Sequence, residues 1–162
     1  MEARLDLKTA SPEGAKAMGA LNAFIHHCGL EKSLLELVKL RASQVNGCGH
    51  CLDMHWKDLR AMGESEQRLY LLDAWREAPF YSDRERAALA WTEAVTLITQ
   101  GGAPDDVYEQ VRAQFSDEEL ANLTLAIIAI NGNNRVNIAF RTVPGSYVPK
   151  GQRVEQEAVA AR

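Results

Sequence analysis

Helix-start and helix-stop signals recur along the whole chain and most constrain its fold. Ser82-Asp83-Arg84-Glu85 and Ser116-Asp117-Glu118-Glu119 both match the capping box, in which a serine and a glutamate three residues later satisfy free amides at a helix N-terminus. Between such signals apolar residues recur with helical spacing. The pattern predicts helices over residues 15–28, 32–44, 48–62, 65–77, 82–99, 104–115 and 116–130, the last resuming through 141. Because no set of alternating strands remains, we expect an all-α fold.

The size and charge of the chain limit how many domains it can form and which classes of partner it can bind. Its 162 residues, 46% of them hydrophobic, suffice for one core without disulfide scaffolding. A formal net charge of −4 argues against nucleic acid or an anionic membrane as a partner. The N-terminus lacks an apolar signal region and the longest apolar stretch, residues 123–130, is too short to span a bilayer. We therefore expect a cytoplasmic protein.

The composition changes near residue 142. From Thr142 through Arg153 the chain is rich in Pro, Gly, Lys and Gln, which is typical of an extended arm, and residues 155–162 are only weakly helical in pattern. The sequence thus predicts one helical domain over residues 1–142, followed by a C-terminal arm and tail over 143–162.

The three cysteines are too few, and odd in number, for a secreted disulfide framework. Cys48 and Cys51 form a CxxC motif that directly follows Val45-Asn46-Gly47, a turn sequence. Cys28 stands beside a predicted helix end and is interpreted as a packing or capping residue. Attention therefore falls on the CxxC pair.

Cys48, Cys51 and His55 stand at i, i+3 and i+7, along roughly one face of a helix. This spacing brings the cysteine α-carbons within about 5–6 Å, close enough for a disulfide. The helix N-terminus favours thiolate, which by itself singles out the first cysteine, Cys48. His55 lies about 6 Å along the axis from Cys51 but about 10 Å from Cys48, so it can better activate Cys51. Either cysteine is a candidate nucleophile on these grounds.

Glu36 lies on the preceding predicted helix, and a helical hairpin through the turn would bring its carboxylate beside the CxxC motif. There it could orient His55 or relay a proton. Three alternatives stay open: zinc binding by Cys48, Cys51, His55 and Glu36, an inert buried cysteine pair, or a non-enzymatic redox-responsive interaction protein.

Glu36, eleven intervening residues, Cys48-Gly49-His50-Cys51 and then His55 together resemble the alkylhydroperoxidase D-like branch of the carboxymuconolactone decarboxylase superfamily. Residues 39–43, 46, 52–55, 134–137 and 139–141 extend the similarity over most of the helical core. The CxxC motif is absent from the plain decarboxylases of that superfamily, so its presence argues against lactone decarboxylation.

This resemblance implies an all-helical subunit in a homotrimer or homohexamer that reduces hydrogen peroxide or organic hydroperoxides. It implies that Cys51 attacks the peroxide, Cys48 resolves the product into a disulfide, and His55 and Glu36 assist proton transfer. His50 matches a histidine that some members use near the reactive thiol. No cofactor or metal is then expected beyond the redox-active Cys48–Cys51 disulfide, which an external dithiol or lipoyl-type partner would reduce.

Overall fold

The computed structural model describes residues 2–149 and consists of helices and the loops between them, with no strand in that range. The all-α prediction is confirmed. The elements are α1 (Leu7–Ala10), α2 (Pro12–His26), α3 (Lys32–Asn46), α4 (Gly49–Ala61), α5 (Glu66–Tyr70), the 3₁₀ helix η1 (Leu72–Ala74), α6 (Asp83–Thr96), α7 (Ile98–Gly101), α8 (Asp105–Arg112) and α9 (Asp117–Phe140).

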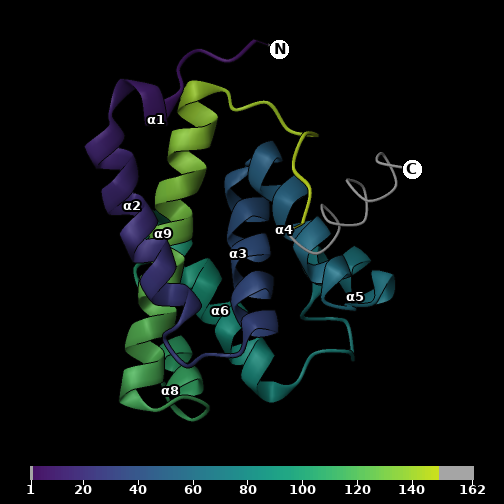
Figure 1. Cartoon of the computed structure of the whole chain (residues 1–162). Coiled ribbons are helices and arrows are strands. Elements are labelled where there is room, and N and C mark those ends of the chain that lie inside the picture. The colour runs from purple at the N-terminus through teal and green to yellow at the C-terminus, as the bar shows by residue number, and fades with distance from the viewer. Residues whose placement is uncertain (1, 150–162) are drawn as a thin grey trace.

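Helix α3 occupies the centre of the molecule and packs against α4, α6 and α9 (Figure 1). Every residue from Leu34 to Leu40 is buried, because these neighbours cover α3 on several sides. Leu35 and Val38 belong to a core cluster shared with α6 and α9, whereas Leu37 and Leu40 belong to one shared with α4, α5 and α6. The central helix is therefore held rigidly, and so are the polar side chains that it carries.

The turn between α3 and α4 forms as the sequence predicts. Gly47 ends α3 in the left-handed conformation, with φ 69°, and the Cys48 amide donates to the Ser43 carbonyl at 3.0 Å. Cys48 is the N-cap of α4 rather than its first helical residue. Asn46 ties this turn to α9, because its amide group donates to Asn134 Oδ1 at 2.8 Å.

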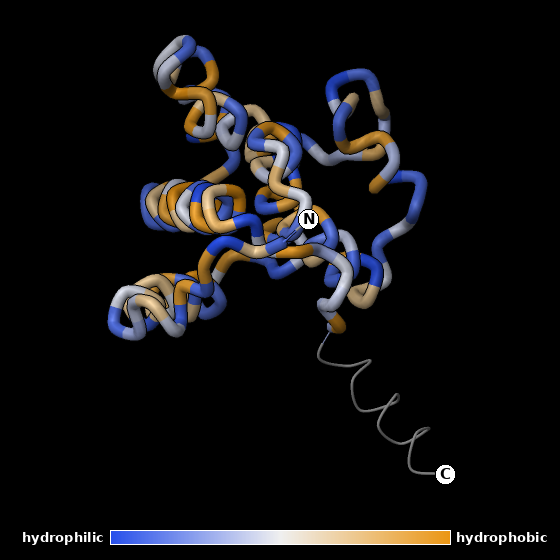
Figure 2. The backbone as a smooth tube through the Cα atoms, turned by 90° about the horizontal axis from the view of Figure 1, so that it is seen from above, coloured by the Kyte–Doolittle hydropathy of each residue, from blue (hydrophilic) through white to orange (hydrophobic). Residues whose placement is uncertain are grey.

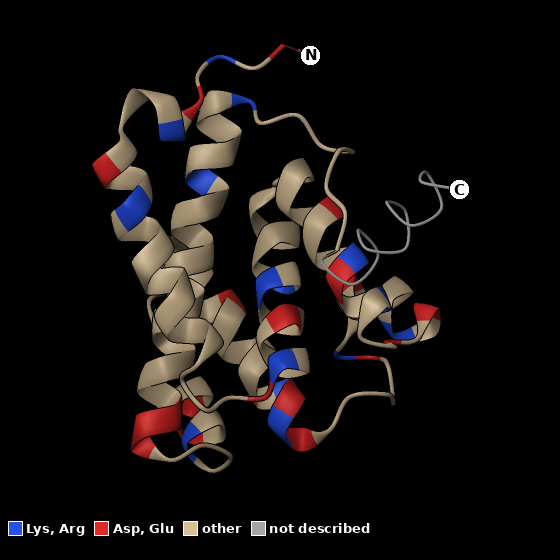
Figure 3. Cartoon of the chain, viewed as in Figure 1, with Lys and Arg blue, Asp and Glu red and all other residues tan. Residues whose placement is uncertain are grey.

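Both predicted capping boxes are present, at Ser82 with Glu85 and at Ser116 with Glu119. They place acidic residues in the first turns of α6 and α9, where the helix dipole favours negative charge (Figure 3). Along the helices, hydrophobic and hydrophilic residues are interleaved, as the helical periodicity requires (Figure 2).

Three helix predictions need correction. Residues 65–77 form only the short α5 and η1, because Trp75 and Leu72 turn inward to fill the core beneath that loop. The helix expected over 82–99 ends at Thr96 and is followed by the separate α7. Conversely, α9 runs without interruption through Gly132, where it packs against α2 and α3 and tertiary burial outweighs the weak helix propensity of glycine.

Residues 142–149 contain neither helix nor strand and run from the end of α9 to α4 (Figure 1). The weakly helical pattern at 155–162 lies outside the described residues. Within residues 2–149, none of the helices has the length and apolar character required to cross a membrane.

Glu93 on α6 joins α3 to the loop before α6 through three hydrogen bonds. Its carboxylate accepts hydrogen bonds from Arg41 Nε at 2.7 Å, Trp75 Nε1 at 2.8 Å and Arg76 Nη1 at 2.6 Å. Glu93→Ala removes three hydrogen bonds and leaves the largely buried Arg41 guanidinium with the exposed Asp73 carboxylate as its remaining counter-charge, so we expect the free energy of unfolding to fall by about 3 kcal/mol. Urea denaturation measures the change. Glu109→Ala on the exposed face of α8 is the control, and an equal loss in both variants would contradict this role.

Candidate functional site

The structure brings the sequence-predicted site residues together at the α3–α4 hairpin. Cys48 caps α4, His50, Cys51 and His55 lie on α4, and Glu36 faces them from α3. Cys48, Cys51, His55 and Glu36 are all buried. The hairpin inferred from the turn sequence thus places the carboxylate beside the CxxC helix.

The two cysteines form a closely coupled pair. Their sulfur atoms lie 2.6 Å apart, within hydrogen-bonding contact of each other, and both cysteines are free. This hydrogen bond, aided by the main-chain amides of Cys51 and His50, lowers the pKa of Cys48 to about 7 against the opposing effect of burial. The same bond, with burial and the neighbouring sulfur's charge, raises the pKa of Cys51. The two thiols therefore titrate as one coupled pair, and the directions of their pKa shifts favour the first negative charge on Cys48.

Asparagines of α9 complete the surroundings of the sulfurs. Asn137 Nδ2 donates to Cys51 Sγ at 3.4 Å, and the Asn134 side chain lowers the pKa of both cysteines. Asn134 is held in turn by Ser43 Oγ, to which it donates at 3.0 Å. These amide donors stabilise a thiolate on either sulfur.

Both carboxylate oxygens of Glu36 have polar partners. Oε2 lies 2.6 Å from His55 Nδ1, and Oε1 accepts a hydrogen bond from Lys39 Nζ at 2.8 Å. Burial raises the pKa of the Glu36 carboxyl, but the hydrogen bond and charge of His55, together with the charge of Lys39, bring it down to about 2. Glu36 is therefore ionised at neutral pH and orients the His55 ring.

The second ring nitrogen of His55, Nε2, is buried and has no hydrogen-bond partner among the described residues. With Nδ1–H directed at the Glu36 carboxylate, a neutral His55 carries a lone pair on Nε2. His50 likewise has a buried Nδ1 without a partner in residues 2–149. An unpaired basic nitrogen next to a redox-capable thiol pair is the arrangement that accepts a proton.

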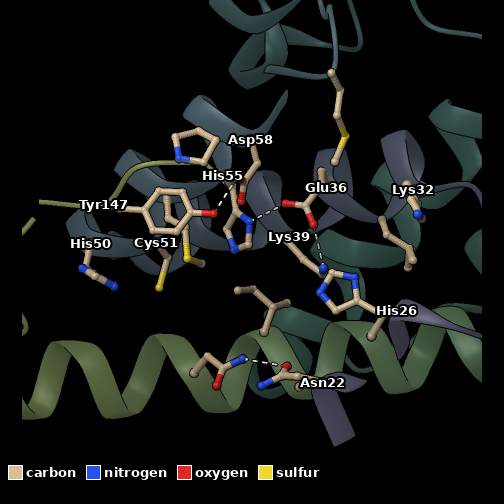
Figure 4. A pocket seen from close by; sticks show the side chains of 18 of the residues that line it. Asn22, His26, Lys32, Glu36, Lys39, His50, Cys51, His55, Asp58 and Tyr147 are labelled. Atoms are coloured by element: carbon tan, nitrogen blue, oxygen red, sulfur yellow. Dashed lines mark hydrogen bonds and ion pairs between the residues drawn. The ribbon is translucent and has the colours of Figure 1, made fainter. Parts of the chain in front are cut away.

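A cavity of about 650 Å³ opens onto this group from between α2, α3, α4 and α9. Cys51, His50, His55 and Glu36 line it, whereas Cys48 does not (Figure 4). Much of the remaining wall is apolar and consists of Leu35, Met54, Ala61, Met62, Ala126, Ala129 and Ile130. A ligand in this cavity therefore lies against the buried Cys51 rather than Cys48.

The sequence analysis assigned no site role to several polar residues of the cavity, among them Lys39, Asp58, Asn137 and Tyr147. Lys39 stands three residues after Glu36, a helical ion-pair spacing that the sequence does contain. Asp58 likewise follows His55 by three residues and so shares its helix face. Asn137 and Tyr147 come from α9 and from the arm after it, and no local pattern relates them to the CxxC motif.

Glu36, His55 and Asp58 bring potential metal-ligand atoms within 4.8 Å of one another. Their carboxylates already accept hydrogen bonds, since Glu36 binds Lys39 and His55 while Asp58 accepts from Tyr147 Oη at 2.7 Å. Over the described residues this group does not include either cysteine. The zinc site considered from the sequence, built on Cys48 and Cys51, therefore gains no support from this grouping.

Residues 12–94 fit the model of the Carboxymuconolactone decarboxylase family. The uncharacterized protein YdfG of Bacillus subtilis (strain 168) is 42% identical over 140 residues, covering 86% of this chain and 95% of that protein. The alkyl hydroperoxide reductase AhpD of Bradyrhizobium diazoefficiens is 44% identical over 41 residues, 25% of this chain and 22% of that protein.

Among solved structures, a protein of unknown function from Agrobacterium tumefaciens, named as a candidate antioxidant defence protein AhpD, superposes with a TM-score of 0.87. It shares 47% sequence identity and covers 90% of this chain and 100% of its own. The helical architecture around the cavity is thus the alkylhydroperoxidase D-like core fold.

Proposed function

The chain belongs to the carboxymuconolactone decarboxylase family, and on that premise we propose that it is a thiol-dependent peroxidase working through a Cys48–Cys51 dithiol/disulfide cycle. The observation that carries this proposal is the pair of adjacent sulfurs, one of which faces a cavity beside the Glu36–His55 pair. Thiolate, access and a proton acceptor are the requirements for peroxide reduction by cysteine.

Cys51 is the attacking sulfur in this proposal because it lines the cavity and Cys48 does not. The raised pKa of Cys51 means that its thiol keeps the proton at rest, so in this proposal Cys51 gives that proton to His55 as it attacks. Attack on the O–O bond converts Cys51 to a sulfenic acid and releases water or an alcohol. Cys48 then attacks that sulfur, releasing water and closing the disulfide.

His55 takes up the thiol proton at Nε2 in this scheme, and Glu36 stabilises the resulting imidazolium through Nδ1. His50, with its unpaired Nδ1, assists at the cavity wall. The disulfide is returned to the dithiol by thiol–disulfide exchange with an external dithiol, of which a lipoyl-type group is one.

The apolar wall of the cavity favours an organic hydroperoxide over hydrogen peroxide as the substrate. Consumption of cumene hydroperoxide and of hydrogen peroxide, driven by dihydrolipoamide or dithiothreitol, tests the proposal. We expect dithiol-dependent turnover with a higher kcat/KM for cumene hydroperoxide. If the pair is oxidised but neither dithiol supports turnover, the protein is instead a redox-responsive interaction protein.

Self-association forms part of the proposal. Phe24 on α2 and Ile128 and Ile138 on α9 are 46–50% exposed, although large apolar side chains are normally covered. A homotrimer or homohexamer would bury such side chains between copies. Sedimentation equilibrium is expected to give three or six times the chain mass, and a monomer at micromolar concentration would reject this part.

A further inference from the structure

The arm after α9 is fastened to α4 by polar contacts. Lys57 Nζ donates to the Tyr147 carbonyl at 3.0 Å, and Asp53 Oδ2 accepts from the Gly145 amide at 3.0 Å. Lys57 and Asp53 also pair with each other at 2.9 Å. One face of α4 thus fixes the arm over the cavity, where Tyr147 and Pro149 become part of the lining.

Tyr147 directs its hydroxyl toward the centre of the site. It donates to Asp58 Oδ1 at 2.7 Å, and the Asp58 carboxylate lies in the same 4.8 Å group as Glu36 and His55 (Figure 4). Cys51 lines the same cavity. The arm therefore places a phenol near the reacting sulfur, and that phenol is hydrogen-bonded to a carboxyl.

Cleavage of a hydroperoxide needs a proton at this position. When the Cys51 thiolate bonds to the terminal oxygen, the O–O bond breaks and the other oxygen leaves as a strongly basic alkoxide. Glu36 holds both Lys39 and His55, and His55 has taken up the thiol proton. A second donor makes departure of the alkoxide possible without first returning that proton.

Tyr147 and Asp58 have the chemistry of such a donor. A phenol hydroxyl both donates and accepts, so the Tyr147 hydroxyl, which donates to Asp58 in this structure, can turn its proton toward a leaving oxygen and accept one from the carboxylic acid form of Asp58. Burial raises the pKa of the Asp58 carboxyl, and the negative charge of Glu36 adds to this, against the opposing hydrogen bond from Tyr147. Asp58 thereby retains a proton more readily than an ordinary aspartate.

Resting on the proposed peroxidase function, we propose that Tyr147 protonates the leaving oxygen of an alkyl hydroperoxide and is itself reprotonated by Asp58. In this step the sulfur–oxygen bond forms, the O–O bond breaks, and the Tyr147 proton moves to the alkoxide to give the alcohol. Sulfur is oxidised from thiolate to sulfenic acid and the peroxide is reduced. The Asp58 proton replaces that of Tyr147, and solvent restores Asp58. Tyr147 is thus the catalytic residue and Asp58 its positioning partner.

Leaving-group dependence tests this assignment more sharply than activity alone. tert-Butyl hydroperoxide releases a basic alkoxide, whereas peracetic acid releases a carboxylate whose conjugate acid has a pKa of about 4 and needs no proton. The readout is the single-turnover rate of thiol loss, so that the external dithiol does not limit the rate. Tyr147→Phe is expected to slow the reaction with tert-butyl hydroperoxide about 100-fold and that with peracetic acid less than about threefold.

Asp58→Asn should show the same selectivity with a smaller loss. Tyr70→Phe is the matched control, since it removes an exposed hydroxyl bonded to the Glu66 carboxylate away from the cavity. Equal slowing with both peroxides would assign Tyr147 a purely structural role, and unchanged rates would show that it donates nothing; either overturns the inference. A wild-type protein inert to both peroxides would instead remove the proposed function itself.

Discussion

Cys51→Ser is expected to abolish peroxide reduction, with kcat/KM falling by more than about 10³-fold. The reason is access, because the cavity reaches Cys51 and a serine hydroxyl cannot form a sulfenic acid. Cys48→Ser should behave differently. It retains the attacking sulfur, so one equivalent of peroxide is consumed and a stable Cys51 sulfenic acid accumulates without turnover. Steady-state assays and chemical trapping of sulfenic acid measure the two outcomes.

Cys28→Ser is the matched control for both cysteine variants. Cys28 is half-buried against the core and is not among the cavity-lining residues, so its replacement should leave turnover unchanged. Sulfenic acid that forms in Cys51→Ser but not in Cys48→Ser would reverse the assignment. It would make Cys48, whose pKa is lowered to about 7, the nucleophile as well as the first thiolate.

Glu36→Gln is expected to lower the free energy of unfolding at pH 7 by about 3 kcal/mol, because the buried Lys39 ammonium loses its counter-charge. The carboxyl has a pKa of about 2 in the folded protein against 4.5 ordinarily. A depressed folded-state pKa contributes stability that is fully present above the ordinary value and is lost as pH falls toward the folded value. Wild-type stability should therefore decline by about 3 kcal/mol from this group between pH 4.5 and 2.

In Glu36→Gln the decline in stability between pH 4.5 and 2 should be smaller, since glutamine does not titrate. Urea denaturation at a series of pH values measures both effects. Glu13→Gln is the control: Glu13 pairs with Lys16 at the same three-residue spacing on α2, but both side chains are exposed, so little change is expected. If the stability of Glu36→Gln fell with pH as steeply as that of the wild type, the buried pairing would be contradicted.

Local sequence chemistry predicted the parts of the site that depend on neighbours in the chain. The Asn46-Gly47 turn, both capping boxes and the side of α3 that bears Glu36 follow from signals within a few residues. The same local reasoning overextended the helix at 65–77, because the inward turn of Trp75 depends on core residues distant in sequence. Propensity does not record such tertiary contacts.

The choice between the two cysteines could not be decided from spacing alone. Helix position and the lowered pKa of Cys48 favour a thiolate on Cys48, whereas His55 spacing and the cavity lining favour Cys51. Tyr147 was beyond prediction for a related reason. Its position depends on the path of the arm back to Lys57 and Asp58, some 89–90 residues earlier in the chain. A segment that folds back onto a helix so distant in sequence leaves no periodic signal in the sequence.

The central claim is that Cys48 and Cys51 form a catalytic dithiol that peroxide converts to a disulfide. Intact mass and free-thiol counts of the reduced protein, taken before and after one equivalent of cumene hydroperoxide, test it most directly. The expected result is rapid loss of two of the three thiols, a mass decrease equal to two hydrogens, and full recovery on addition of a dithiol. Three thiols that persist in the presence of peroxide would contradict the claim.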